Sequence, residues 1–532
     1  MTCSSNTISR TSRLFTVLAL LALVASPVRG DVPADALAKA RAALAKADGI
    51  AAEAPLRSAL RSGANADLVR AELGEALLLQ GDRRAAREVL YGGNFVAQSA
   101  ARGWQVRGRL ELAEGRYVEA GQAFDNSLKI KADSGSLWGD IARLRFAGGE
   151  QAQAIEAADR AVKLNPKDPR ALELRGLLIR EQFGLFAALP WFEAGLRVAS
   201  DDVGLLGEYA ATLGDMGQYK AMLVVCRKLT EVDPGNVRAL YLQAVLAARS
   251  GQTSLARKIL LQTGTVLRDM PAALLLNGIL EYRAGNTNLA VGHFDRLLRM
   301  QPENLQARML LTRALQRQGL NQQAAETAQG WAERGDAAPY LLTITGKAHV
   351  ALGRKAEGVA LFERADEVGN NGPEVLPPGQ PLGVLALTYA DAPNLAGNAV
   401  PYIRGLLDAG DDAAAVMAAE RLQRANPGAA EAWLLAGDAR LLSGDNLGAL
   451  DRYGRGASIR FNLPTLQRID YAMRQLGRGE QANAMVARYL RQNPGNPQAM
   501  KLLSFGRQSL GNEVGAQRLE AVLRARGLRN PS

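Results

Sequence analysis

The amino-acid sequence predicts an all-α solenoid built from short antiparallel helix pairs that stack one on the next. Three residue classes repeat every 34 positions: a glycine where the first helix of each pair ends, a small residue inside that helix, and an alanine in the second helix. One such pair cannot bury its apolar face alone, so the pattern predicts neighbours packed on both sides. The turn glycines are Gly81, Gly115, Gly149, Gly217, Gly251, Gly285, Gly319 and Gly353, with Phe183 as the one miss and Gly184 beside it.

The clearest unit runs from Gly135 to Asp168. Its first half carries the face Trp138, Ile141, Ala142 and Arg145 and ends at Gly149; its second half carries Ala154, Ala158 and Ala161 and stops at Pro166. A glycine past a helix end can take the left-handed conformation that closes the last turn. This unit resembles the tetratricopeptide repeat, a 34-residue helix–turn–helix motif. The resemblance implies a right-handed superhelix whose concave groove is lined by the first helix of every unit.

The small residue inside each first helix also keeps the register. A glycine in mid-helix costs about 1 kcal/mol relative to alanine, so its recurrence predicts that another helix approaches closely at that point. The series is Gly74, Gly108, Ala142, Gly176, Ala210, Ala244, Gly278, Thr312 and Gly346.

Residues 1–30 have a different composition from the rest of the chain. Arg10 and Arg13 precede an apolar run from Leu14 to Ala25, and small residues follow up to Gly30. This is the layout of a secretory signal peptide cleaved after Gly30, and the run is short for a bilayer span, which needs about 20 residues. We therefore expect a periplasmic protein with no stable membrane span after cleavage. The alternatives are a secreted protein and one that keeps an N-terminal membrane anchor.

The repeats predict the organisation of the remaining chain. Residues 31–66 are a degenerate capping repeat, and 67–372 are nine contiguous units. Prolines and glycines in 373–395 interrupt the period and leave room for one short helix, Leu382 to Ala390, and 396–530 are four further units. Because the interruption breaks nearest-neighbour stacking, we expect two cooperative blocks. The expected unit starts are Asp67, Ala101, Gly135, Pro169, Val203, Val237, Pro271, Leu305, Pro339, Ala396, Ala430, Leu463 and Pro497.

Composition narrows the classes of partner. The chain has 64 basic and 53 acidic residues, a formal net charge of +11. The basic residues are spread along the array, which together with the export signal argues against nucleic acid. An acidic polysaccharide stays open as a partner. Beyond residue 30 the one cysteine is Cys226, at a position where other units have Phe or Leu, so we expect it to be buried.

No group of residues in the sequence matches a catalytic or metal-binding motif. The two histidines, His293 and His349, lie in different units without a second ligand at metal-binding spacing. Asp201-Asp202 and Asp411-Asp412 are explained as helix caps. The sequence therefore predicts a protein that is not an enzyme and has no cofactor and no metal.

The resemblance does imply a binding surface. In the family, the second, fifth, ninth and twelfth positions of each unit line the groove. In this chain those positions are rich in arginine and tyrosine, which suits a protein or peptide ligand. The Lys and Asn residues with which some family members clamp a C-terminal carboxylate are absent. The candidate groove residues are Arg102, Gln105, Arg109, Arg143, Phe146, Tyr241, Tyr282, Arg313, Arg317, Tyr340 and Lys347.

The expected function is a non-catalytic exported scaffold that binds partner proteins in the groove, in envelope assembly or exopolysaccharide export. The pathway rests on fold and compartment alone. The alternative is direct binding of an acidic polysaccharide, which would use the same arginines and aromatic residues. The sequence indicates no particular oligomeric state.

Overall fold

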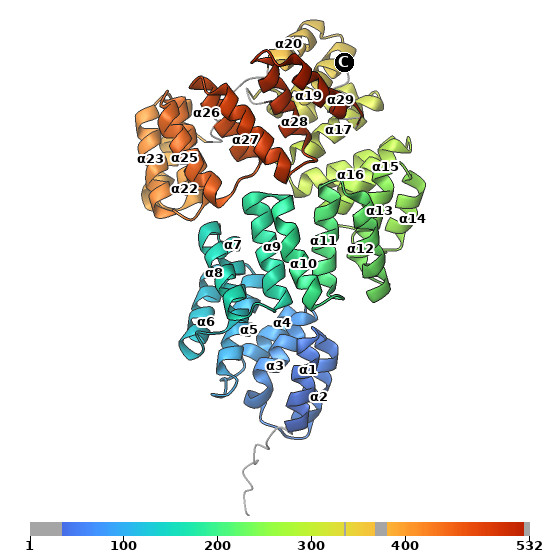
Figure 1. The fold of residues 1–532 in the computed structure, drawn as a ribbon, viewed down its shortest axis with the longest axis vertical. Coiled ribbons are helices and arrows are strands. Elements are labelled where there is room, and N and C mark those ends of the chain that lie inside the picture. The colour runs from blue at the N-terminus through green and yellow to red at the C-terminus, as the bar shows by residue number, and fades with distance from the viewer. Residues whose placement is uncertain (1–33, 335–336, 368–379, 526–532) are drawn as a thin grey trace, which may run out of the picture. The chain divides into compact units, whose positions relative to one another are not determined.

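A computed structural model describes residues 34–334, 337–367 and 380–525. These residues form 29 α-helices and no β-strand (Figure 1). The predicted all-α solenoid of paired helices is therefore confirmed. The predicted signal peptide, residues 373–379 of the predicted insert, and residues 526–530 lie outside the described residues.

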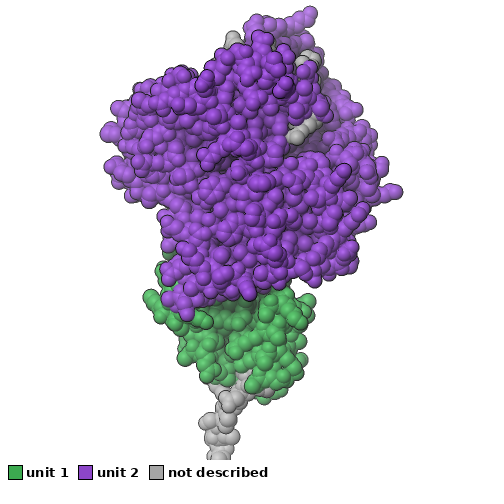
Figure 2. Space-filling model, in the orientation of Figure 1, with its two compact units in different colours: residues 1–131 green, residues 132–532 purple. Residues whose placement is uncertain are grey.

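The chain divides into two compact units, residues 1–131 and 132–532 (Figure 2). The described residues of unit 1, 34–131, form three helix pairs with a core around Leu56, Leu73 and Leu90. Its helices are α1 (Ala34–Ala45), α2 (Gly49–Arg61), α3 (Ala66–Leu79), α4 (Arg83–Tyr91), α5 (Ala100–Ala113) and α6 (Tyr117–Ile130).

Among the described residues of unit 2 the helices again form pairs, and α21 (Leu382–Asp391) interrupts this pattern as a single helix. The first helices of its pairs are α7 (Gly135–Ala147), α9 (Pro169–Phe183), α11 (Val203–Asp215), α13 (Val237–Arg249), α15 (Pro271–Arg283), α17 (Leu305–Arg317), α19 (Pro339–Ala351), α22 (Ala396–Asp408), α24 (Ala430–Leu442), α26 (Leu463–Gln475) and α28 (Pro497–Gln508). The second helices are α8 (Gln151–Leu164), α10 (Leu185–Val198), α12 (Tyr219–Val232), α14 (Thr253–Leu261), α16 (Thr287–Met300), α18 (Asn321–Ala332), α20 (Lys355–Glu367), α23 (Asp412–Ala425), α25 (Asn446–Ile459), α27 (Gly479–Gln492) and α29 (Glu513–Ala525).

The turn glycines act as the sequence predicts. Gly149, Gly285 and Gly353 have φ values of 80°, 86° and 82°, and the other glycines of the series share this left-handed conformation. Residues other than glycine rarely adopt this backbone conformation. At the position where Phe183 breaks the series, Gly184 takes over with φ 112° and caps α9. These glycines end each first helix and turn the chain back into the second.

The small residues inside the first helices allow the predicted close approach. A Cβ atom added to Gly108 would lie 2.3 Å from the ring of Phe124, and one added to Gly278 would lie 2.4 Å from Phe294. Both phenylalanines come from the second helix of the same pair and are almost completely buried. Each ring thus occupies the space that the missing side chain leaves.

The structure also tests the predicted burial of Cys226 and the short helix predicted after residue 381. Cys226 is completely buried among Leu213, Met222 and Leu242, as predicted, and burial raises the pKa of its thiol to about 11. The helix expected at Leu382 to Ala390 is α21, and it packs on α22 through stacked rings of Tyr389 and Tyr402, 4.4 Å apart. Among the described residues, no helix is both long enough and apolar enough to span a membrane.

Candidate partner-binding site

The candidate residues of unit 1 are already engaged with a neighbouring carboxylate. Arg102 donates from Nε to Glu75 Oε2 at 2.7 Å, and Arg109 Nη1 lies 3.0 Å from Glu75 Oε1. The side chain of Glu75 is only 11% exposed. Gln105, between the two arginines on α5, is buried. The two cations and Glu75 therefore form a compact ion-pair group that joins α3 to α5.

Sequence reasoning missed Glu75, although a signal for it exists. Glu75 and Arg109 occupy the ninth position of adjacent units, and they are 34 residues apart. Residues at the same position of neighbouring units face each other across first helices. A carboxylate at that position therefore indicates that the following arginine is neutralised.

Two of the three candidates in the first helices of unit 2 before α15, Arg143 and Tyr241, also have partners within the chain. Arg143 pairs with Asp140 one helical turn earlier, at 3.2 Å. The hydroxyl of Tyr241 donates to the carbonyl oxygen of Ala272 at 3.4 Å, and burial raises its pKa, with a further contribution from Asp215. Phe146 is 43% exposed. These positions show no group of cations that is open to a ligand.

Arg180 and Arg238 repeat the arrangement of unit 1 farther along the array. Both contact the carboxylate of Glu208, Arg180 at 3.1 Å and Arg238 at 2.6 Å. The side chain of Glu208 is 15% exposed. Two arginines that share one enclosed carboxylate are thus a recurring way to tie first helices together in this chain.

The candidates on α15, α17 and α19 are arranged differently. Two arginines stack on one ring: the guanidinium carbons of Arg313 and Arg317 lie 5.4 and 4.8 Å from the ring centroid of Tyr282. Arg317 also donates to the carbonyl oxygen of Tyr282 at 3.3 Å. We call Tyr282, Arg313, Arg317, Tyr340 and Lys347 the tyrosine–cation patch.

The second tyrosine of the patch is anchored in the core. Tyr340 packs beside Met309 and the buried Leu341. Burial raises the pKa of its hydroxyl, and Arg313, which forms a hydrogen bond with that hydroxyl, opposes the shift. Tyr340 therefore keeps its proton at neutral pH and presents a fixed phenol beside an arginine.

The cations of the patch have no acidic partner within the described residues. Arg313, Arg317 and Lys347 are exposed, and none of them pairs with a carboxylate of residues 34–334, 337–367 or 380–525. Stacking on a ring stabilises a guanidinium through its face and leaves N–H groups at its edge for an acceptor. Lys347 occupies the ninth position of its unit, as Arg313 does in the unit before. The patch is therefore a positively charged surface with two rigid rings.

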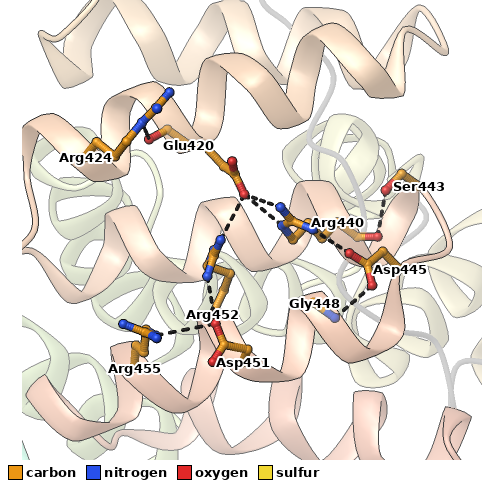
Figure 3. A network of polar contacts seen from close by, with 9 residues as sticks. All are labelled: Glu420, Arg424, Arg440, Ser443, Asp445, Gly448, Asp451, Arg452 and Arg455. Carbon is orange, nitrogen blue, oxygen red and sulfur yellow. Dashed lines mark hydrogen bonds and ion pairs between the residues drawn. The ribbon is translucent and has the colours of Figure 1, made fainter.

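A third cluster of charged residues also consists of arginines that pair with carboxylates. In α23–α25, Glu420 accepts hydrogen bonds from Arg440 and from Arg452, and Arg440 also contacts Asp445 (Figure 3). Burial raises the pKa of Glu420, but the hydrogen bonds from Arg440 and Arg452 outweigh it and hold the pKa below its ordinary value. The hydrogen bond from the Gly448 backbone, followed by that from Arg440, lowers the pKa of Asp445. This network joins α23, α24 and α25, and Arg440 and Arg452 both pair with a carboxylate.

Each of the two histidines lies in or beside the packed helices of its own unit. His349 Nδ1 lies 2.7 Å from Glu357 Oε2, a contact between the two helices of one pair. His293 is half-buried, and burial lowers its pKa. In the part of the chain that the structure describes, no three His, Cys, Asp or Glu side chains gather as metal ligands would.

Comparison with known families agrees with the geometry of the helix pairs. Residues 111–178 and residues 275–340 each match a tetratricopeptide repeat model. These two segments of the chain are therefore tetratricopeptide repeats. The second match includes most of the tyrosine–cation patch. Tetratricopeptide repeats are protein-interaction modules, so the chain is built as a scaffold for contacts with other proteins.

One curated relative of this repeat protein is the Photosystem I assembly protein Ycf3 of Synechococcus sp. (strain CC9902). The two sequences are 34% identical over 103 residues, which are 17% of this chain and 59% of the relative. The chain thus spans about three fifths of the length of the curated relative that it matches.

Solved structures with similar folds include other repeat proteins. The Cut9–Hcn1 hetero-tetramer of APC/C is 14% identical, with 89% of this chain and 96% of that chain covered and a TM-score of 0.33. The human IFIT1 dimer with m7Gppp-AAAA is 15% identical, with 73% and 90% covered and a TM-score of 0.41. PilF of Pseudomonas aeruginosa is 17% identical, with 40% and 96% covered and a TM-score of 0.34. At these identities and scores the likenesses say nothing about function.

Proposed function

We propose that this repeat protein is an exported, non-catalytic scaffold that binds an acidic segment of a partner protein on the tyrosine–cation patch. The observation that carries the proposal is the difference in charge compensation among the candidate residues. Arg102, Arg109 and Arg143 have carboxylate partners, whereas the three exposed cations of the patch have none among the described residues. A cationic surface without internal counter-ions attracts an anionic ligand.

The chemistry of the patch suits a peptide with carboxylate side chains. An arginine can hold a carboxylate through two parallel hydrogen bonds, and hydrogen bonds to charged groups each contribute about 1.5–3 kcal/mol. Tyr282 and Tyr340 add flat apolar area that loses little conformational entropy on binding. Arginine and tyrosine are also the residues that most often dominate the binding energy of protein interfaces.

The proposed location and pathway rest on other features. The charged, apolar and small-residue segments of residues 1–30 support export to the periplasm. The match to a curated assembly protein supports a role in assembling a protein complex. In an exported protein, that complex would belong to the envelope or to exopolysaccharide export.

Binding of an acidic polysaccharide is the second candidate, because the same cations and rings would contact uronate carboxylates. The two ligand classes are separated by titrating the full chain with poly-glutamate and with polygalacturonate at low and high salt. Saturable binding of poly-glutamate, lost at least tenfold in a variant with Arg313→Ala, Arg317→Ala and Lys347→Ala, supports the protein ligand. Patch-dependent binding of polygalacturonate alone would overturn it.

A pull-down from envelope extract then identifies the partner. The patch variant is compared with the wild type and with a matched control, Lys39→Ala, Arg84→Ala and Arg299→Ala, which removes the same charge. The three control residues are well exposed and form only pairs within one helical turn. We expect a specific partner to be lost by the patch variant and kept by the control. Equal partner sets for all three proteins would contradict the patch as the binding site.

A further inference from the structure

Within unit 2, turns that are far apart in the sequence contact each other. Residues 151–153, 181–185 and 215 lie against residues 428–431, 458–461 and 492–495, and the hydrogen bonds between them join residues 276 to 308 positions apart. The contacts join α9 to α25 and α10 to α27 (Figure 1). We call this set of contacts the seam. The period of the repeats does not predict it.

At one end of the seam, the start of α8 meets the start of α24. The backbone N–H of Ala152 donates to the carbonyl oxygen of Gly428 at 3.1 Å. In return, Gln151 accepts from the backbone N–H of Ala430 at 3.1 Å and donates to Glu431 at 3.0 Å. The first N–H groups of a helix have no partner within it, so each helix start here is capped by the distant turn.

In the middle of the seam, the end of α9 meets the end of α25. The N–H of Phe461 donates to the carbonyl oxygen of Gln182 at 3.2 Å. Arg460 crosses the seam to Glu181, with Nη2 at 3.0 Å, and also pairs with Glu431 of its own side, with Nη1 at 2.7 Å. These ion pairs are partly exposed, since the side chains of Glu181 and Glu431 are 40% and 56% accessible. Salt therefore screens them.

At the other end, the turn before α28 lies directly against the end of α11. The backbone N–H of Leu185 donates to Asn493 at 3.4 Å. A Cβ atom added to Gly495 would lie 2.9 Å from the carbonyl oxygen of Asp215, so nothing larger than glycine fits without a shift of the backbone. The seam is close-fitting at this point.

The seam is polar, and some of its buried polar atoms lack hydrogen-bond partners. Within the described residues, its buried atoms Gln153 Oε1, Gln182 Oε1, Gln492 Oε1 and Arg460 Nε have no hydrogen-bond partner. Buried polar groups without partners weaken an interface, because water would satisfy them after separation. Polar contacts between parts of one chain resemble transient interfaces and permit relative motion.

We propose that the seam is a reversible latch in unit 2, closed by the Arg460 bridge and the capped turns, and opened by ionic strength or by a partner. When the latch is closed, it joins the two ends of the chain segment that lies between the two sides of the seam. The helices α15, α17 and α19 belong to that segment. Open, it lets these helices separate from the C-terminal repeats and admits a bulky ligand. The latch does not depend on which ligand binds the patch, and its test reads conformation alone.

A matched pair of glycine variants tests the latch in the full chain. Gly495 and Gly235 both stand in an Asx-Pro-Gly-Asn turn before a first helix, and neither has a positive φ. Only Gly495 is at the seam; near Gly235 the closest atom to an added Cβ is 3.9 Å away. With Gly495→Ala we expect hydrogen exchange at the amides of Ala152 and Phe461 to accelerate at least about tenfold. With Gly235→Ala we expect no change.

Charge reversal provides an independent test. Arg460→Glu places like charges opposite Glu181 and Glu431 and should increase the radius of gyration measured by small-angle scattering. Adding Glu181→Arg and Glu431→Arg to it should restore the wild-type value, and high salt should enlarge the wild type but not Arg460→Glu. Unchanged exchange in Gly495→Ala together with an unchanged radius in Arg460→Glu would overturn the latch. Failure of the triple variant to recover would do the same.

Discussion

The unit-1 arginine pair and the tyrosine–cation patch both contain an arginine at the ninth position of a unit, with opposite electrostatic outcomes. Arg109 and Arg313 both occupy the ninth position of their units. The ninth position of the preceding unit holds Glu75 in the first case and Ile279 in the second. For these two arginines, the residue one unit earlier distinguishes an arginine that pairs with a carboxylate from one that has no carboxylate partner among the described residues. A groove residue is therefore best interpreted together with its neighbour one unit earlier.

The largest expected effect is on stability. Arg102→Ala with Arg109→Ala leaves Glu75 enclosed without its two cations, which should cost about 3 kcal/mol of local stability. Arg313→Ala with Lys347→Ala removes no ion pair within the described residues and should cost about 1 kcal/mol or less. Hydrogen exchange of the amides of α3 and α5, and of α17 and α19, measures the two costs. Recovery of the unit-1 variant by Glu75→Gln would confirm the cause, and equal costs at both sites would contradict the comparison.

The next largest effect is on binding. Ile279→Glu gives Arg313 the counter-ion that Glu75 gives Arg109, and it should weaken poly-glutamate binding about tenfold, since a neutralised arginine no longer attracts the ligand. Val245→Glu is the matched control: it occupies the ninth position one unit earlier, and the ninth position after it is the uncharged Ile279. Isothermal titration of the three proteins tests this. Equal losses in both variants would mean that added charge alone acts, without pairing.

The smallest expected effect is on the pH dependence of stability. The pKa of Glu420 is lower in the folded chain than its ordinary value, so its contribution to stability is present above that ordinary value. The contribution is lost as the pH falls through the lowered folded pKa, where Glu420 takes up a proton. Glu420→Gln should cost about 1 kcal/mol at neutral pH and remove this acid-dependent part. Denaturation midpoints between neutral pH and pH 3 measure the difference. Parallel pH profiles for variant and wild type would refute the assignment.

The helices follow from the sequence because the signals that define them are local. Gly149, Pro166 and Trp138 each act within one or two turns of a helix, and their 34-residue recurrence places α7 and α8 and the equivalent pairs correctly. The short helix expected at Leu382 to Ala390 forms as α21, whereas the prolines that predict the interruption before it lie mostly outside the described residues. Whether the array unfolds as two blocks stays a prediction.

The state of the candidate residues was less predictable, for a physical reason. Groove positions are defined by the period, but charge compensation depends on partners at variable separations: Arg109 finds Glu75 34 residues away, and Arg180 finds Glu208 28 residues away. The seam is harder still, because it consists mainly of backbone groups and glutamines in turns that resemble every other turn in the chain. The assignment of a partner to the patch stays a proposal.

The separation between the two sides of the seam has a consequence for the order of folding. Stacking of adjacent helix pairs uses contacts between near neighbours, which form quickly, whereas contacts of high sequence separation bear a larger cost of loop closure and form late. In a chain that emerges N-terminus first, α15, α17 and α19 can fold before Asn493 and Gly495 exist to close the seam. A partner present at that time would meet an array whose seam has not yet closed, and it would bind without first having to open the latch.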